Sequence, residues 1–157
     1  MCDKAEDGVW GSAGGGVDGG GGGLTVAREI MRQLPNERIV YFGDTARVPY
    51  GNKSRETIIK FSRQIVRFLK THQVKAIVVA CNSASAYALE VLEQEADIPI
   101  IGVIRSGARA AIDATKNGKI GVIATEATIG SGIYNRYIKE NDANAAVLGK
   151  ACPLFVP

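Results

Sequence analysis

The chain has 157 residues and a formal net charge of +3 at pH 7, with the charges spread along the sequence. Its 46% hydrophobic and 22% charged residues are typical of a soluble globular protein with a sizeable core. A weak, dispersed positive charge predicts neither a nucleic-acid nor a membrane partner. No apolar run approaches the roughly 20 residues that span a bilayer, and residues 1–23 have no signal-peptide core, so we expect a cytoplasmic protein.

The three cysteines, Cys2, Cys81 and Cys152, are widely spaced, and His72 is the single histidine. No CxxC motif is present, so the sequence predicts no metal site. In a reducing compartment we expect free thiols, each with a reactivity that depends on its surroundings.

The N-terminal segment is dominated by glycine, with nine glycines in residues 11–23. Ordering such a stretch is costly in entropy, and it offers few side chains to pack. An alternating fold needs a buried strand before its first helix, and only Val17 suggests one. We therefore interpret residues 1–23 as a poorly ordered segment with an altered first strand, followed by an α/β domain over residues 24–150.

From residue 24 onward, apolar runs of strand length alternate with amphipathic stretches. The amphipathic stretches predict helices over residues 24–34, from Ser54 as N-cap, from Cys81, over 106–117, and over 127–140. The apolar runs predict strands over residues 38–43, 75–80, 99–104, 119–124 and 145–148. This alternation predicts right-handed βαβ crossovers and a doubly wound parallel sheet with helices on both faces.

In parallel sheets of this kind, ligands bind at the carboxyl ends of the strands. Four segments of the chain lie at such ends, and we expect them to face one crevice: residues 18–23, 44–52, 81–85 and 125–128.

Cys81 is the clearest candidate for chemistry because it stands where a predicted strand ends and a helix begins. Unpaired N–H groups at a helix N-terminus favour thiolate over thiol and can lower a cysteine pKa from ~8.5 to roughly 3.5–7.5. The neighbouring Asn82 and Ser83 could hold a carboxylate or an ammonium group. The alternative is a small buried residue at a strand-to-helix turn, and the two readings are about equally supported.

Asp18 precedes the longest glycine run, where backbone amides could approach an anion and the carboxylate could bind an ammonium group or move a proton. On spacing alone, an ordinary solvated aspartate in a glycine linker is the better reading. GxGxxG matches trivially inside polyglycine and no Walker motif is present, so nucleotide binding is not predicted. Tyr50, at a turn-like loop tip, is either a substrate lid or a cover for the core edge.

Three segments carry a family resemblance: residues 43–54 (GDTARVPYGNKS), 79–86 (VACNSASA) and 123–129 (IATEATI). With them, the chain resembles glutamate racemase of the aspartate/glutamate racemase superfamily, from about residue 17 to its end. The resemblance implies the N-terminal domain of a normally two-domain racemase, with residues 151–157 starting the inter-domain segment. Family members commonly form homodimers, which implies a possible homodimer here.

The resemblance also implies roles for ten residues. Two fall on catalytic positions of the family, Cys81 and Asp18. Eight fall on substrate-binding positions, namely Gly19, Pro49, Tyr50, Gly51, Asn82, Ser83, Thr125 and Thr128. Gly19 stands where the family has serine, and Arg105 and Ser106 replace the more usual acidic residue and proline.

Such an enzyme interconverts L- and D-glutamate without a cofactor and supplies D-glutamate for peptidoglycan. Two cysteines on opposite faces of the substrate exchange the α-proton, which inverts the carbon. The family's second cysteine lies in a Cys-Thr-His motif that this sequence does not contain, and Cys152 has a different context. We therefore expect the chain to be inactive by itself.

Two alternatives remain open. A sister activity, aspartate or hydantoin racemisation, is disfavoured by the GDTARVPYGNKS segment. A non-catalytic fragment that binds a dicarboxylate or a partner is favoured by the glycine-rich N-terminus and the missing cysteine.

Overall fold

The computed structural model describes residues 9–14 and 21–153. All strand pairs in this range are parallel. One sheet has the order β2-β1-β3-β4, made of β1 (Val9–Gly14), β2 (Arg38–Gly43), β3 (Val74–Val79) and β4 (Ile100–Gly102). A second sheet pairs β5 (Lys119–Ala124) with β6 (Ala146–Ala151).

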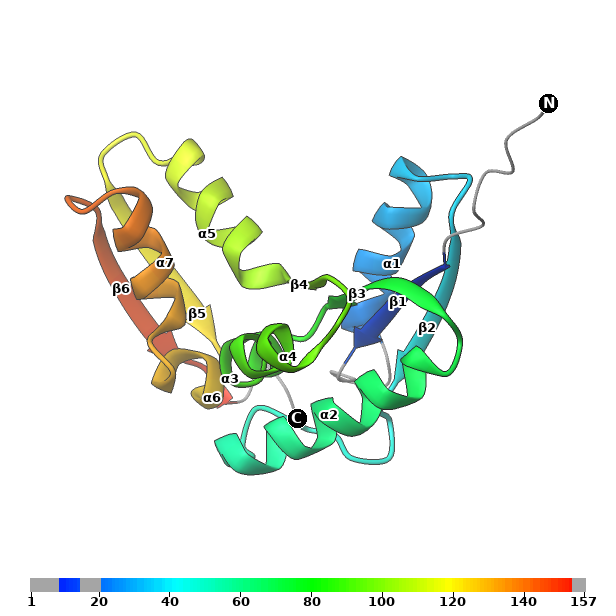
Figure 1. Cartoon of the computed structure of the whole chain (residues 1–157). Helices are drawn as coiled ribbons and strands as arrows, with labels where there is room; N and C mark the ends of the chain where they lie inside the picture. The colour runs from blue at the N-terminus through cyan, green and yellow to red at the C-terminus, as the bar shows by residue number, and fades with distance from the viewer. Residues whose placement is uncertain (1–8, 15–20, 154–157) are drawn as a thin grey trace.

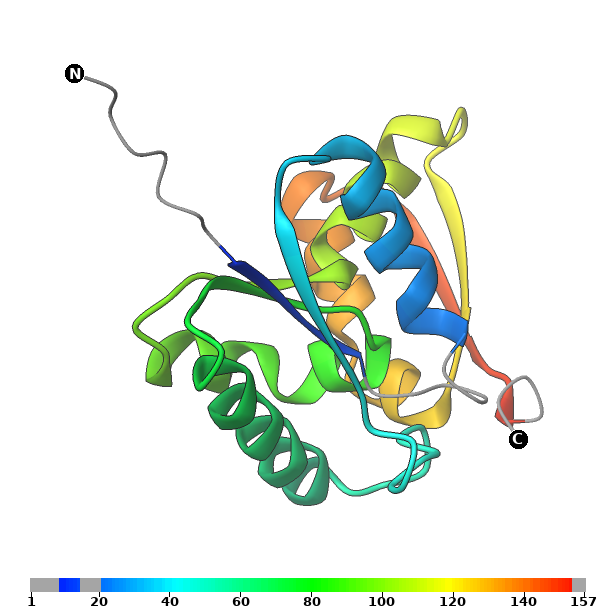
Figure 2. The same ribbon diagram turned by 90° about the vertical axis from the view of Figure 1, so that its right-hand side faces the viewer.

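The helices connect these strands in sequence. They are α1 (Gly21–Gln33), α2 (Arg55–Lys70), α3 (Asn82–Tyr87), α4 (Leu89–Glu95), α5 (Val103–Ala114), α6 (Glu126–Gly130) and α7 (Ile133–Asn141). Figure 1 shows a V in which the four-stranded sheet with α1 forms one arm and the two-stranded sheet with α5 and α7 forms the other. Helices α1 and α2 lie on opposite sides of the four-stranded sheet (Figure 2). The predicted α/β class with parallel strands is confirmed.

The strands do not form the single continuous sheet that we expected from the sequence. Strand β4 has only three residues, and α5 begins directly after it at Val103, so the chain leaves the first sheet at once. Each sheet then has its own hydrophobic cluster. The first gathers apolar residues of β3, α2, α3 and α4 around Ile77, and the second gathers those of α5, β5 and α7 around Ile104 and Ile138. The division of the chain at residues 23 and 150 stays a prediction.

The first strand lies earlier than predicted. It occupies Val9–Gly14, and its backbone pairs with β2 on one side and β3 on the other. The suggestion of a strand at Val17 is therefore wrong in position, and Val17 itself lies outside the described residues. Parallel pairing on both sides satisfies the backbone N–H and C=O groups of a strand whatever its side chains are, which an argument from apolar residues overlooks.

Helix α2 begins as predicted, with the Ser54 hydroxyl accepting a hydrogen bond from the backbone N–H of Thr57. Its inward face carries Ile58 and Leu69, which are both fully buried. The apolar spacing of the sequence also predicts Phe68 on that face, but Phe68 is 46% exposed and packs against Phe42 with ring centroids 5.2 Å apart. The buried face is therefore narrower than the sequence pattern indicated.

The single helix predicted over residues 127–140 is two helices, α6 and α7. Gly132 separates them with a φ of +67°, in the left-handed region. That conformation is costly for residues with a Cβ and easy for glycine, so the chain turns there. The turn directs α7 onto the second sheet and places Tyr134 beside the carboxyl end of β3.

A matched pair of isoleucines tests the position of the core. Ile77 is fully buried in β3, and Ile123 in β5 is 64% exposed. We expect Ile77→Ala to lower the free energy of unfolding by about 2–5 kcal/mol, because it leaves a cavity. Ile123→Ala should change it by about 0.5 kcal/mol or less. Urea unfolding followed by circular dichroism measures both, and equal effects would contradict the core described here.

Candidate functional site

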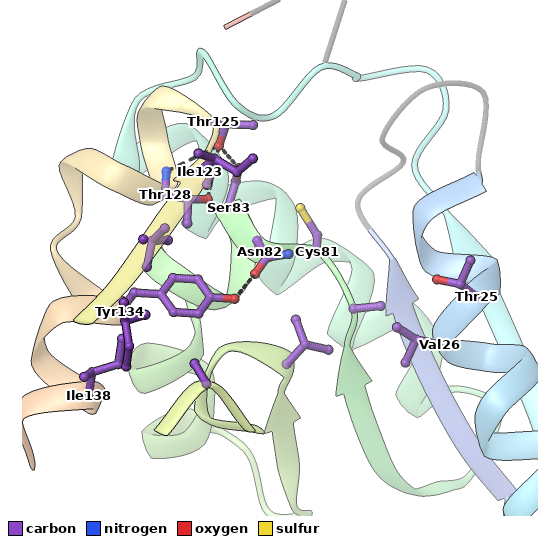
Figure 3. A pocket seen from close by; sticks show the side chains of 17 residues that line it. Thr25, Val26, Cys81, Asn82, Ser83, Ile123, Thr125, Thr128, Tyr134 and Ile138 are labelled. Atoms are coloured by element: carbon purple, nitrogen blue, oxygen red, sulfur yellow. Dashed lines mark hydrogen bonds between the residues drawn. The ribbon is translucent and has the colours of Figure 1, made fainter. Parts of the chain in front are cut away.

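A cavity of about 740 Å³ lies between the two arms of the V. Its walls come from five parts of the chain: the start of α1, residues 80–83 after β3, two residues of α5, residues 120–125 along and just after β5, and α6 with α7. Figure 3 shows the labelled side chains around it. Of the four segments expected to face one crevice, those after β3 and β5 meet here and bring Cys81, Asn82, Ser83, Thr125 and Thr128 together. The expectation is wrong for residues 44–52, none of which lines the cavity.

Cys81 lies at the N-cap of α3, where β3 ends, and is 3% exposed. Its sulfur faces the cavity in Figure 3, although the residue also belongs to the first hydrophobic cluster. Burial raises the pKa of the Cys81 thiol, and hydrogen bonds from the backbone N–H groups of Ala84 and Ser83 oppose this effect only in part. The sequence argument expected a lowered pKa, and the structure contradicts it because desolvation outweighs the N-terminus of a six-residue helix.

Three hydroxyl groups form a chain across the cavity wall. The Ser83 and Thr125 hydroxyls lie 3.0 Å apart, and the Thr125 hydroxyl donates to Thr128 Oγ1 at 3.1 Å. Thr125 is also the N-cap of α6, since its hydroxyl accepts from the backbone N–H of Thr128. These hydrogen-bonded hydroxyls join α3, which follows β3 of the first sheet, to α6, which follows β5 of the second sheet. The site is therefore held together at the point where the two arms meet.

The loop of residues 44–52 rests on a buried carboxylate. Asp44, 3% exposed, accepts hydrogen bonds from the Tyr50 hydroxyl and from Arg47 Nε, the latter at 2.9 Å. Burial, and next the hydrogen bond to Asp44, raise the pKa of Tyr50, so its phenol stays protonated. The sequence pointed to Tyr50 but not to Asp44, although an aspartate directly after a strand with an arginine three residues later was a usable signal.

Tyr50 points into the hydrophobic cluster and is not among the residues that line the cavity. Of the two interpretations given for this tyrosine, covering the core is the one that its burial favours. Pro49 precedes it at the end of a cis peptide bond from Val48. The substrate-binding roles of Pro49 and Tyr50 stay predictions.

Gly51 brings the loop against the hydroxyl chain. Its carbonyl accepts a hydrogen bond of 3.0 Å from the backbone N–H of Ala127, in the first turn of α6. A Cβ at this position would lie 2.7 Å from Cβ and Cγ2 of Thr125, so only glycine allows the approach. The loop therefore contributes backbone, and not the Tyr50 side chain, to this edge of the site.

Tyr134 of α7 also reaches the site, and the sequence analysis missed it. Its hydroxyl donates to Asn82 Oδ1 at 2.9 Å (Figure 3). The two residues are 52 positions apart in the sequence. No local motif marks Tyr134, so only the packing of α7 could reveal it.

Asp18 and Gly19 lie outside the described residues, as does Cys2. Cys152 is partly exposed at the end of β6 and does not line the cavity. Within residues 9–14 and 21–153, no three His, Cys, Asp or Glu side chains are grouped so that they could hold a metal ion. In the same part of the chain, no helix has the length and apolar character needed to cross a bilayer.

The chain is similar in sequence and fold to known proteins. The family model described as Asp/Glu/Hydantoin racemase matches residues 21–153. A glutamate racemase of Chlorobaculum tepidum is 56% identical over 141 residues, which is 89% of this chain and 52% of that relative. One from Oceanobacillus iheyensis is 52% identical over 141 residues, with 90% and 52% covered. The chain thus spans about half the length of the curated relatives it matches.

Solved structures agree with these matches. The crystal structure of a glutamate racemase isoform from Bacillus anthracis has a TM-score of 0.89 at 50% identity, over 94% of this chain and 54% of that one. Glutamate racemase of Francisella tularensis in complex with D-glutamate has a TM-score of 0.86 at 43% identity, over 95% and 54%.

The burial of Cys81 leads to a labelling prediction. Because burial raises the pKa of the Cys81 thiol, this group is in its unreactive neutral form at pH 7. Iodoacetamide should therefore modify the partly exposed Cys152 well before Cys81, and the labelling of Cys81 should accelerate as the pH rises. Peptide mass spectrometry over a pH series resolves the two sites. Faster labelling of Cys81 than of Cys152 at pH 7 would contradict the raised pKa and would support the low-pKa thiolate expected from the sequence.

Tyr50→Phe tests the buried carboxylate. At pH 7 it should lower the free energy of unfolding by about 1–3 kcal/mol, because Asp44 loses a buried donor. Since the Tyr50 pKa is raised in the folded state, the unfolded chain releases this proton first, near pH 10. Wild-type stability should therefore fall as pH rises above 10, and less steeply in Tyr50→Phe.

Urea unfolding at pH 8, 10 and 11 measures this difference in slope. Tyr41 and Tyr134 also have raised pKa values and are present in both proteins, so the slope should decrease without vanishing. Identical slopes would show that Tyr50 ionises as freely in the folded state as in the unfolded one.

Proposed function

Because the chain belongs to the Asp/Glu/Hydantoin racemase family, we propose that it carries one half of the active site of a glutamate racemase. The observation behind this proposal is the convergence of Cys81, Asn82, Ser83 and Thr125 on one cavity at the carboxyl ends of β3 and β5. Relatives named glutamate racemase, between 52% and 57% identical, support glutamate as the substrate. The Francisella tularensis structure in complex with D-glutamate supports an amino-acid ligand in this fold.

In the proposed reaction, Cys81 serves one face of the α-carbon. A thiolate on one face takes the α-proton, the electron pair stays on the carbon next to the carboxylate, and a thiol on the opposite face returns a proton. As a thiol at neutral pH, Cys81 is suited to the donating role, and it becomes a base once it has given up its proton. The exchange balances in atoms and charge with one thiolate and one thiol, which swap protonation states in each turnover, so we propose no cofactor.

The polar groups around Cys81 suit the charges of an amino acid. The backbone N–H groups of Ser83 and Ala84, which already bond the sulfur, favour its anionic form while the proton is away. Asn82 and the hydroxyls of Ser83, Thr125 and Thr128 are donors and acceptors for substrate carboxylates and ammonium. Asp18 and Gly19 complete the proposed set from the family resemblance.

The wider context is part of the same proposal. The enzyme would work in the cytoplasm, as a homodimer in the manner of its family, and would supply D-glutamate for peptidoglycan. Aspartate racemisation and plain dicarboxylate binding are the alternatives. Assays with a panel of amino acids distinguish aspartate racemisation from glutamate racemisation. An absence of turnover in a longer chain with intact Cys81 would favour plain dicarboxylate binding.

Binding and turnover can be tested on the 157-residue chain. We expect calorimetry to detect glutamate binding, and a D-glutamate assay to detect no racemisation, because residues 9–14 and 21–153 place no second thiol in the cavity with Cys81. Asn82→Ala should weaken binding by about tenfold through loss of polar contacts, and Cys152→Ser should leave it unchanged. Sustained turnover by this chain would contradict the two-thiol assignment, and equal binding of aspartate would contradict the substrate.

A further inference from the structure

We propose that Tyr134 is a positioning residue that fixes the Asn82 amide, so that its Nδ2 group is presented to the bound amino acid on the Cys81 side of the cavity. The inference rests on the proposed function, because it concerns how the same site holds its ligand. Neither the sequence motifs nor the family resemblance pointed to Tyr134.

The contact between the two side chains defines the orientation. The Tyr134 hydroxyl donates to Asn82 Oδ1 at 2.9 Å, a normal length for an O–H···O bond. The two ends of an asparagine amide have nearly the same shape but opposite hydrogen-bonding character. A donor held at one end therefore selects the orientation that places oxygen there and the two N–H donors on the other side.

Figure 3 shows the result of that selection. The Asn82 oxygen faces Tyr134, and the nitrogen lies on the side of Cys81. Both Asn82 and Tyr134 line the cavity. An Nδ2 group in this place offers N–H donors to an oxygen of the ligand, and a carboxylate oxygen is the acceptor that benefits most.

The phenol is itself held in place by α5. A Cβ added at Gly107 would lie 3.1 Å from the Tyr134 hydroxyl oxygen, so the hydroxyl fits against the bare backbone of that helix. The ring is half-buried, and this burial raises the pKa of Tyr134, so the hydroxyl keeps its proton over the physiological range. Tyr134 is therefore a fixed and permanent donor to Asn82.

A role limited to joining α7 to α3 would predict a different outcome. Loss of such a link would lower stability but would leave the orientation of Asn82 and the affinity for ligand unchanged. A positioning role predicts that ligand affinity and the Asn82 amide signals change together.

The experiment uses the 157-residue chain with Tyr134→Phe, and Tyr87→Phe as the matched control. Tyr87 lies on α3 like Asn82, but its hydroxyl lies near Gly130 and outside the cavity lining. Calorimetry with L- and D-glutamate should show affinity reduced about three- to tenfold in Tyr134→Phe, the effect of one hydrogen bond. Tyr87→Phe should change it less than about twofold.

Nuclear magnetic resonance of the Asn82 side-chain NH₂ group provides the second readout. In Tyr134→Phe, but not in Tyr87→Phe, the two amide signals should shift in the free protein and should respond less to added glutamate. Wild-type affinity together with unchanged Asn82 signals in Tyr134→Phe would overturn the proposal.

Two further outcomes are informative. If the wild-type chain binds neither enantiomer, the proposed function is contradicted, and the amide signals of the free protein alone decide whether Tyr134 orients Asn82. If Tyr134→Phe does not fold, Gly107→Ala takes its place. This variant retains the hydroxyl but forces it to move, and alanine favours the helix. Unchanged glutamate affinity and Asn82 signals in Gly107→Ala would overturn the proposal.

Discussion

The site depends on one side chain, Thr125, which three segments share. Its hydroxyl caps α6, lies 3.0 Å from the Ser83 hydroxyl, and donates to Thr128. Its methyl side packs where Gly51 leaves room for it. Because these partners belong to both arms of the V, the cavity has a defined shape only when the two sheets are joined at this point.

The ionisation of the Cys81 thiol is controlled by its burial. Cys81 is 3% exposed within the first hydrophobic cluster, and desolvation opposes ionisation of its thiol more strongly than the neighbouring N–H groups favour it. Once negative charge forms on the sulfur, the N–H groups of Ser83 and Ala84 stabilise it more strongly than they would in water, because the buried site has a low dielectric constant. The site thus holds a neutral thiol at rest and has donors already in place for its anion.

Polar groups at the site serve two different purposes. Asp44, Arg47 and Tyr50 bond to one another beneath the loop and give it a rigid base. Asn82 and the hydroxyls of Ser83, Thr125 and Thr128 line the cavity itself. Tyr134 serves both purposes, since it lines the cavity and its hydroxyl also supports the Asn82 side chain. The loop with the long family signature therefore supports the cavity wall from behind, through the contacts of Gly51 with Thr125 and Ala127, and does not line the cavity itself.

The amino-acid sequence by itself determined the parallel α/β class, the Ser54 cap, and the meeting of the segments after β3 and β5. These features depend on local spacing and on the fixed geometry of parallel strands. The resemblance to the aspartate/glutamate racemase superfamily is confirmed by the family match. Only the tertiary structure decided the position of β1, the two separate sheets, the direction of the Cys81 pKa shift and the contact between Tyr134 and Asn82. Each of these depends on pairing or desolvation between residues far apart in the chain, which local patterns do not record.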